Sequence, residues 1–231
     1  MPGFAPRHFL CSYPAMIDHR AFIRANTAVT APPLLPEIRL HLATEVTPLW
    51  QATEAVLAES NLPPPYWAFA WVGGQAVARH LLDHPQWVAG RRVLDFASGS
   101  GVVAIAAALG GAASVTAVEI DAFAAAAIAL NAELNGAAIH VLAEDLVGRP
   151  LPDIDLVLAG DVCYERPMAE RVTGWLRSLA HDGMPVILGD PGRAYLPEQG
   201  LEALAHHAVP TTRDIEDREI RNTTVWRMLA L

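Results

Sequence analysis

An acid followed by two glycines stands near the middle of this chain of 231 residues. A short apolar segment from residue 93 ends at Asp95, and Gly99 and Gly101 then precede an Ala-rich stretch at residues 102–109. This order predicts a buried strand, a tight turn without bulky side chains, and a helix whose first N–H groups stay open to a ligand. We expect Asp95 at the carboxyl end of the strand, facing the crevice where open α/β sheets bind nucleotide-like ligands.

A second acid follows the next predicted strand. Glu119 stands twenty positions after Gly99, the usual place for a carboxylate that binds a ribose diol. The Gly-x-Gly-x-x-Ala pattern of the turn also fits a dinucleotide site, and a structural turn without a ligand is a further alternative. Asp95 favours S-adenosylmethionine, because a carboxylate repels a pyrophosphate but attracts a positive α-ammonium group. We therefore predict a methyl-donor site.

Composition excludes several classes of partner. The formal charge of −9 and the pI near 5.4 argue against nucleic acid, which requires a basic surface. No apolar run reaches the roughly 18–20 residues of a membrane span. The nine histidines lack the spacing of metal ligands, so we expect no metal. The length fits one domain with an arm, and the 52% hydrophobic content is enough for a sizeable core.

Cysteine and lysine usage also constrain the chemistry. Cys11 and Cys163 form no disulfide framework, which favours a reducing compartment. The first residues lack the apolar region of a secretory signal, so we expect the cytoplasm for a bacterial protein and the mitochondrial matrix for a eukaryotic one. Apart from histidine, all 16 basic residues are arginines, and the chain contains no lysine. It therefore cannot form a lysine Schiff base or bind a phosphate through a Walker-type lysine.

The pattern of elements predicts two parts. Residues 1–60 form an arm that is Pro-rich at first and then carries short helices at 37–42 and 48–59, and residues 61–231 form an α/β domain. In that domain apolar strands alternate with helical patterns, which is typical of a doubly wound parallel sheet. Strands are expected at 93–95, 114–118, 139–143, 155–161 and 185–189, helices at 75–83, 102–109, 122–135, 167–180 and 198–207, and an antiparallel hairpin at 211–215 and 223–229.

Four aromatic residues are clustered within residues 66–71, ahead of the first core strand. Trp67 and Trp71 are expected to wall the donor or the substrate amine, because aromatic faces attract cations. We expect Tyr66 and Phe69 to pack between arm and domain.

Acids also follow the third and fourth strands. Asp145 is placed to accept a bond from an adenine amine, with an exposed loop acid as the alternative. Asp161 ends the fourth strand, which lies beside the first across the switch in strand order and so faces the methyl group; a structural cap is its alternative role. Arg193, in a turn at the same rim, either holds a carboxylate there or caps its own turn.

Together these motifs resemble class I methyltransferases. More narrowly, Asp161-x-x-Tyr164 is similar to the motif of seven-β-strand protein lysine methyltransferases, above all the family that modifies the β subunit of electron transfer flavoprotein. The resemblance covers most of the chain, including Tyr-Trp-Ala at residues 66–68 and Gly-Asp-Pro-Gly-Arg at residues 189–193. Phe-Ala-Ser at residues 96–98 departs from the family, which more often has a glycine in this turn.

The resemblance implies a Rossmann-like doubly wound α/β fold with a seven-stranded sheet, S-adenosyl-L-methionine as cofactor, and transfer to lysine ε-amines of that β subunit. Asp161, Tyr164 and Trp67 are then expected near the target lysine. The donor is expected to be bound by Trp71, Asp95, Ala97, Ser98, Gly99, Gly101, Glu119, Ile120, Asp145, Leu146 and Gly160.

Other acceptors stay open at this point. Ribosomal protein L11 and a small-molecule amine are alternatives, and a donor-binding module without turnover is an alternative from another class. A nucleic-acid base is less favoured, because the chain is acidic and lacks Asn-Pro-Pro-Tyr after the fourth strand.

Overall fold

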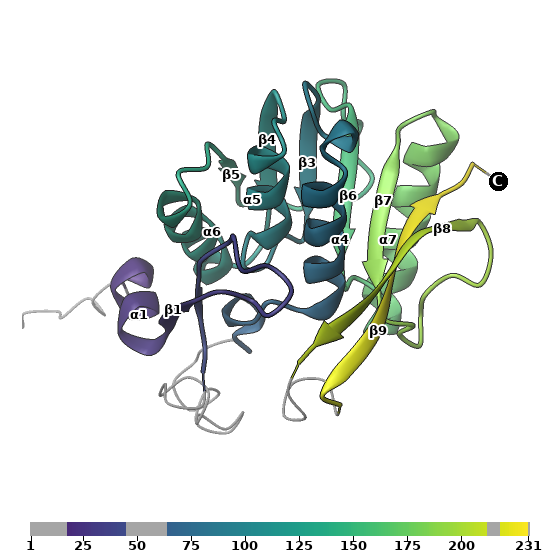
Figure 1. The fold of residues 1–231 in the computed structure, drawn as a ribbon. Coiled ribbons are helices and arrows are strands. Elements are labelled where there is room, and N and C mark those ends of the chain that lie inside the picture. Colours follow the sequence, from purple (N-terminus) through teal and green to yellow (C-terminus); the bar gives the residue numbers. More distant parts are fainter. Residues whose placement is uncertain (1–17, 45–63, 212–217, 231) are drawn as a thin grey trace, which may run out of the picture.

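A seven-stranded sheet forms the centre of the protein (Figure 1). The computed structural model describes residues 18–44, 64–211 and 218–230. The strand order is β5-β4-β3-β6-β7-β9-β8, parallel from β5 to β7 and antiparallel at β9 and β8. The predicted Rossmann-like sheet with a C-terminal hairpin is thus confirmed. Its strands are β3 (Arg92–Phe96), β4 (Ser114–Val118), β5 (His140–Leu142), β6 (Leu156–Gly160), β7 (Val186–Asp190), β8 (Leu201–Pro210) and β9 (Ile220–Met228).

Helices cover both faces of this sheet, with α4 and α5 on one face and α7 on the other (Figure 1). The central strand β6 is therefore apolar on both sides, and its residues show how the two faces are divided. Leu156 and Leu158 join the core under α4 and α5, while Val157 and Ala159 join the core under α7. The helical segments are α4 (Val72–Asp83), α5 (Val102–Leu109), α6 (Ala122–Leu134), α7 (Arg166–His181) and the short 3-10 turns Tyr66–Ala68 and Pro85–Trp87.

The described part of the predicted arm packs against α6. It comprises α1 (His19–Asn26) and an antiparallel pair of short strands, β1 (Ala28–Thr30) and β2 (Leu40–Leu42). The helix predicted at 37–42 is therefore wrong, because pairing with β1 and burial of the β2 side chains override the local pattern. The helix predicted at 48–59 lies outside the described residues, and the division at residue 60 stays a prediction.

The C-terminal hairpin is built from a different first strand than the one predicted. Residues 198–207 were expected to be helical, but β8 occupies Leu201–Pro210, and residues 212–215 of the strand expected at 211–215 lie outside the described residues. Strand β9 pairs with β7 on one side and with β8 on its other edge. Long-range strand pairing thus outweighs local propensity here.

The other predicted elements are confirmed with shifts of a few residues at their ends. The largest are at the starts of α4, which begins at Val72 rather than at residue 75, and of β9, which begins at Ile220 rather than at residue 223. Among the described helices, none combines the length and apolar character needed to cross a bilayer.

Candidate active site

A cavity of about 700 Å³ opens at the carboxyl ends of the parallel strands. The order of the strands reverses between β3 and β6, and such a switch point leaves a crevice at the sheet edge. The first residues after β3, β4 and β6 are Ala97, Glu119 and Asp161, and all three line the cavity. The acids that follow β4 and β6 therefore do meet in a single site.

The glycine turn after β3 contains three backbones in the left-handed region. Gly99 and Gly101 have φ of 54° and 82°, and Ala97 has φ of 52°. A Cβ at Gly101 would also lie 3.3 Å from Ile128 on α6, so the turn and this helix are in close contact. Ala97, in the stretch where the family more often has a glycine, adopts a conformation that costs an L-residue about 1–2 kcal/mol.

Asp95 does not face the cavity, contrary to the sequence-based expectation. It is 1% exposed, and its Oδ2 accepts hydrogen bonds from Ser98 Oγ at 2.5 Å and from the N–H of Ala104 at 3.0 Å. It thereby caps α5, whose N-cap Gly101 has no side chain to do so. Burial raises the pKa of Asp95 to about 7, although both hydrogen bonds lower it.

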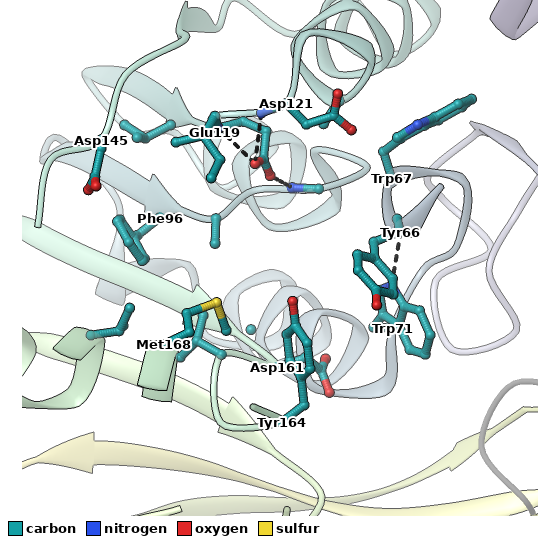
Figure 2. Close-up of a pocket in the computed structure, with 18 of the residues that line it drawn as sticks. Tyr66, Trp67, Trp71, Phe96, Glu119, Asp121, Asp145, Asp161, Tyr164 and Met168 are labelled. Carbon is teal, nitrogen blue, oxygen red and sulfur yellow. Dashed lines mark hydrogen bonds between the residues drawn. The ribbon is translucent and has the colours of Figure 1, made fainter. Parts of the chain in front are cut away.

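Glu119 lies in the cavity, as predicted, at the end of β4. Its Oε2 accepts a hydrogen bond from the N–H of Gly99 at 3.0 Å, and its Oε1 accepts one from the N–H of Ile120 at 2.8 Å (Figure 2). Burial raises the pKa of Glu119 above its ordinary value, and these main-chain N–H groups oppose the shift. The carboxylate is thus oriented before any ligand arrives.

One end of the cavity is mainly apolar. Figure 2 shows Phe96, Met168 and Asp145 together at this end. Asp145 lines the cavity as predicted, and its oxygens accept bonds from Val147 N–H at 3.0 Å and from Arg171 Nη2 at 2.5 Å. The hydrogen bond from Arg171 lowers the pKa of Asp145. An arginine on α7 therefore fixes the acid that sequence analysis assigned to an adenine amine.

The opposite end is aromatic and contains Tyr66, Trp67 and Trp71 (Figure 2). The ring of Tyr66 lies 5.8 Å from that of Tyr164 and 6.1 Å from that of Trp71, whose Nε1 donates to the Tyr66 carbonyl. Trp67 is buried and stacks on Phe123 of α6. Tyr66, expected to pack between arm and domain, is instead half exposed and lines the cavity.

Both carboxylate oxygens of Asp161 accept hydrogen bonds from the protein. Its Oδ1 accepts bonds from Arg193 Nε at 3.0 Å and Nη2 at 2.6 Å, and its Oδ2 accepts one from the N–H of Gly74 at 3.0 Å. The residue is 8% exposed and has φ of 57°. Burial raises the pKa of Asp161, and the Arg193 charge opposes this shift. Of the two roles open to Arg193, holding a carboxylate is the one observed.

Comparison with known proteins identifies the family. The ribosomal protein L11 methyltransferase (PrmA) family matches residues 80–161. The electron transfer flavoprotein β subunit lysine methyltransferase of Xenopus laevis is 40% identical over 90% of this chain and 85% of its own length. This chain belongs to that lysine methyltransferase family.

Two further similarities are found. The Danio rerio enzyme of the same name is 37% identical to this methyltransferase over 96% of the chain and 87% of its own length. A solved ribosomal protein L11 methylase from Lactobacillus delbrueckii subsp. bulgaricus has 22% identity and a TM-score of 0.49, covering 69% of this chain and 79% of that one.

The structure brings most of the predicted site residues of this methyltransferase to one cavity and leaves four behind its wall. Those that line it are Trp67, Trp71, Ala97, Gly99, Glu119, Ile120, Asp145, Gly160, Asp161 and Tyr164. Those buried behind it are Asp95, Ser98, Gly101 and Leu146.

Sequence analysis missed several lining residues: Tyr66, Phe96, Val118, Asp121, Val147, Met168, Arg171 and Val172. Met168, Arg171 and Val172 lie three and four positions apart, and helical periodicity after the fourth strand could have placed them on one face. In the described part of the chain, no three His, Cys, Asp or Glu side chains are arranged to hold a metal.

Proposed function

We propose that this chain transfers methyl groups from S-adenosyl-L-methionine to lysine ε-amines of the β subunit of electron transfer flavoprotein. The observation that carries the proposal is one continuous cavity. It joins the strand ends of β3 and β4 to the aromatic wall formed by Tyr66, Trp67 and Trp71. The relatives named above share this chain over nearly its whole length, and their names give this β subunit as the protein methylated.

The cavity fits the proposed donor. Phe96, Met168 and Val172 provide an apolar slot for adenine, and Glu119 is oriented for a ribose diol. When bound, the donor supplies a methyl group on a positive sulfonium that is already activated for displacement. Its positive charge suits the aromatic wall.

A dinucleotide fits less well. Its pyrophosphate would meet the carboxylates of Glu119 and Asp121 near the glycine turn. Arg171 and Arg193, the arginines among the described lining residues, are each paired with a carboxylate of the protein. The lining thus favours a cationic ligand, even though Asp95, the acid first chosen for that argument, lies behind the wall.

The aromatic wall favours the neutral form of the substrate amine, which methyl transfer requires. A free lysine has a pKa near 10.4, so deprotonation at neutral pH costs about 4–5 kcal/mol. A desolvated channel reduces this cost because it disfavours the ammonium form. Tyr66, Trp67, Trp71 and Tyr164 line the part of the cavity beside the predicted donor site, where a bound substrate side chain would exclude water and complete such a channel.

Asp161 has two groups that could orient the incoming amine, its carboxylate and its main-chain carbonyl. Both carboxylate oxygens already accept bonds from Arg193 and Gly74. The arrangement therefore favours the main-chain carbonyl as the acceptor for the incoming amine.

Intact-mass spectrometry tests the proposal. Purified electron transfer flavoprotein, ribosomal protein L11 and a mixture of small amines would each be incubated with enzyme and donor. The proposal predicts methyl additions on the flavoprotein β subunit. Methylation confined to L11 or to a small amine would assign the enzyme to that acceptor, and donor binding without transfer to any of them would indicate a binding module.

A further inference from the structure

We propose that Arg193 and Asp161 form a positioning pair that holds Tyr164 against the substrate channel. This inference rests on the proposed function. It assigns the Asp161 carboxylate to the conformation of the loop between β6 and α7 (residues 161–165, the β6–α7 loop), not to the substrate amine.

The backbone of Asp161 requires a constraint. Its φ of 57° lies in the left-handed region, which costs an L-residue about 1–2 kcal/mol, although Asp tolerates it better than most. The residue is anchored by its own N–H, which donates to the Gly189 carbonyl on β7 at 3.0 Å. The side chain supplies the remaining restraint.

Both carboxylate oxygens are engaged away from the substrate. Arg193 donates from Nε and Nη2 to Oδ1, at 3.0 and 2.6 Å, and Gly74 donates to Oδ2 at 3.0 Å. Charge-assisted bonds of this kind, in a side chain that is 8% exposed, are stronger than neutral ones. A substrate amine would have to displace one of these donors to reach the carboxylate.

The contact with α4 depends on glycines. A Cβ at Gly73 would lie 2.5 Å from Asp161 Oδ2, and a Cβ at Gly160 would lie 2.7 Å from the nitrogen of Gly74. The first turn of α4 can therefore reach Asp161, and its N–H groups carry the positive end of the helix dipole. Gly73, Gly160 and Gly189 thus allow this helix to contact the strand ends, because a Cβ at Gly189 would likewise overlap Gly73.

Arg193 is itself held in a defined turn. Its N–H and that of Gly192 both donate to Oδ1 of Asp190 at 2.7 Å. Its guanidinium also lies 5.9 Å from the centroid of the Trp71 ring. One arginine therefore connects the end of β7, the β6–α7 loop and the aromatic wall.

Tyr164 is the residue through which this network reaches the reaction. It stands three positions after Asp161, lines the cavity, and its ring lies 5.8 Å from Tyr66 on the facing segment. A displacement of about 1 Å in a positioning group can reduce the rate about 100-fold. Releasing the Asp161 backbone would therefore lower kcat while leaving the donor pocket intact.

Glycine substitution separates positioning from direct contact. We expect kcat to fall on the order of 100-fold in Arg193→Ala and in Asp161→Ala, with the Kd of S-adenosylhomocysteine nearly unchanged. Asp161→Gly should retain about tenfold more activity than Asp161→Ala, since glycine adopts the left-handed conformation without strain. Arg193→Ala should then add little in the Asp161→Gly background, because the two residues act as one unit. A direct role for the carboxylate predicts instead that Asp161→Gly and Asp161→Ala are equally inactive.

A matched control and a second readout complete the test. Arg227→Ala removes a comparable arginine–carboxylate pair, with Glu202 on the hairpin, and should leave kcat unchanged. Fluorotyrosine labelling gives the four tyrosines separate ¹⁹F signals, with that of Tyr164 assigned from Tyr164→Phe. The Tyr164 signal should shift in Arg193→Ala and Asp161→Ala but not in Arg227→Ala.

An unmoved Tyr164 signal in inactive Arg193→Ala would overturn the positioning role. Absence of methyl transfer by the unmodified enzyme would contradict the proposed function alone, because the ¹⁹F signal does not depend on turnover.

Discussion

The Glu119 carboxylate and the Gly99 N–H are twenty positions apart in the sequence and 3.0 Å apart in the structure. This hydrogen bond connects the end of β4 to the glycine turn after β3. The side chain that we propose as the ribose ligand is therefore oriented by the same turn that contributes Ala97 and Gly99 to the cavity lining.

Replacing Glu119 with Ala should weaken binding of S-adenosylhomocysteine about 10- to 100-fold. A hydrogen bond to a charged group contributes about 1.5–3 kcal/mol, and each 1.4 kcal/mol is a factor of ten in Kd. Calorimetric titration measures the change. Glu133→Ala is the control, because this exposed glutamate pairs with Arg20 on α1. Equal affinity of Glu119→Ala and the control would refute the ribose assignment.

Tyr164 is predicted to shape the channel rather than to transfer a proton. Tyr164→Phe keeps the ring that faces Tyr66 and should retain most of kcat, whereas Tyr164→Ala should lose on the order of 100-fold. A proton-transferring hydroxyl would be worth about 10²–10⁴-fold. Initial rates of both variants at saturating donor decide between these roles, and equal inactivity of the two would show that the hydroxyl takes part in the chemistry.

Asn131 joins the arm to the glycine turn. It is fully buried, its Nδ2 donates to the Ser100 carbonyl at 2.8 Å, and its Oδ1 accepts from the His41 N–H at 2.8 Å. Asn131→Ala leaves two buried main-chain groups unpaired, so we expect a loss of about 2–4 kcal/mol in the free energy of unfolding. Tm should fall by roughly 5–15 °C, measured by calorimetry.

The control for this prediction is another asparagine that contacts the arm. Asn135 bonds both main-chain groups of Arg39 in an exposed setting. Asn135→Ala should cost less than about 1.5 kcal/mol, because water replaces its partners. A loss as large as that of Asn131→Ala would show that burial of the Asn131 bridge is not what matters.

Asp95 should make stability depend on pH. Its pKa is raised to about 7 in the folded state, mainly by burial, against about 3.9 in an unfolded chain. The folded state therefore binds the proton more tightly, and this contribution to stability is present below about pH 4 and is lost as pH rises through about 7.

Asp95→Asn should flatten the pH dependence over that window, because Asn keeps an acceptor for Ser98 and Ala104 but does not titrate. Urea titrations at several pH values measure the slope. Asp153→Asn, at a highly exposed side chain, is the control and should follow the unmodified protein. An unchanged slope in Asp95→Asn would mean that this carboxyl does not take up a proton in the folded state.

Local sequence patterns predicted the central part of the fold well. The strand, turn and helix around Gly99 follow from consecutive apolar residues and glycines, and Glu119 follows from its spacing. These features depend on interactions between near neighbours, which a pattern can express.

The failures lie where distant segments meet. The Asp161–Arg193 pair spans 32 positions, and the choice of strand for Leu201–Pro210 depends on pairing with β9. Asp95 turns inward because α5 lacks a capping side chain of its own, a need that is visible only once the turn has its geometry.

The most direct test of the account is the chemical identity of the methylated residue. Electron transfer flavoprotein would be incubated with the enzyme and tritiated S-adenosylmethionine, and the separated β subunit would be hydrolysed to amino acids. The enzyme contains no lysine, so labelled methyl-lysine must come from the acceptor. We predict label in methyl-lysine of the β subunit, greatly reduced with Tyr164→Ala. A β subunit without labelled methyl-lysine, under conditions where the enzyme binds the donor, would contradict the central claim.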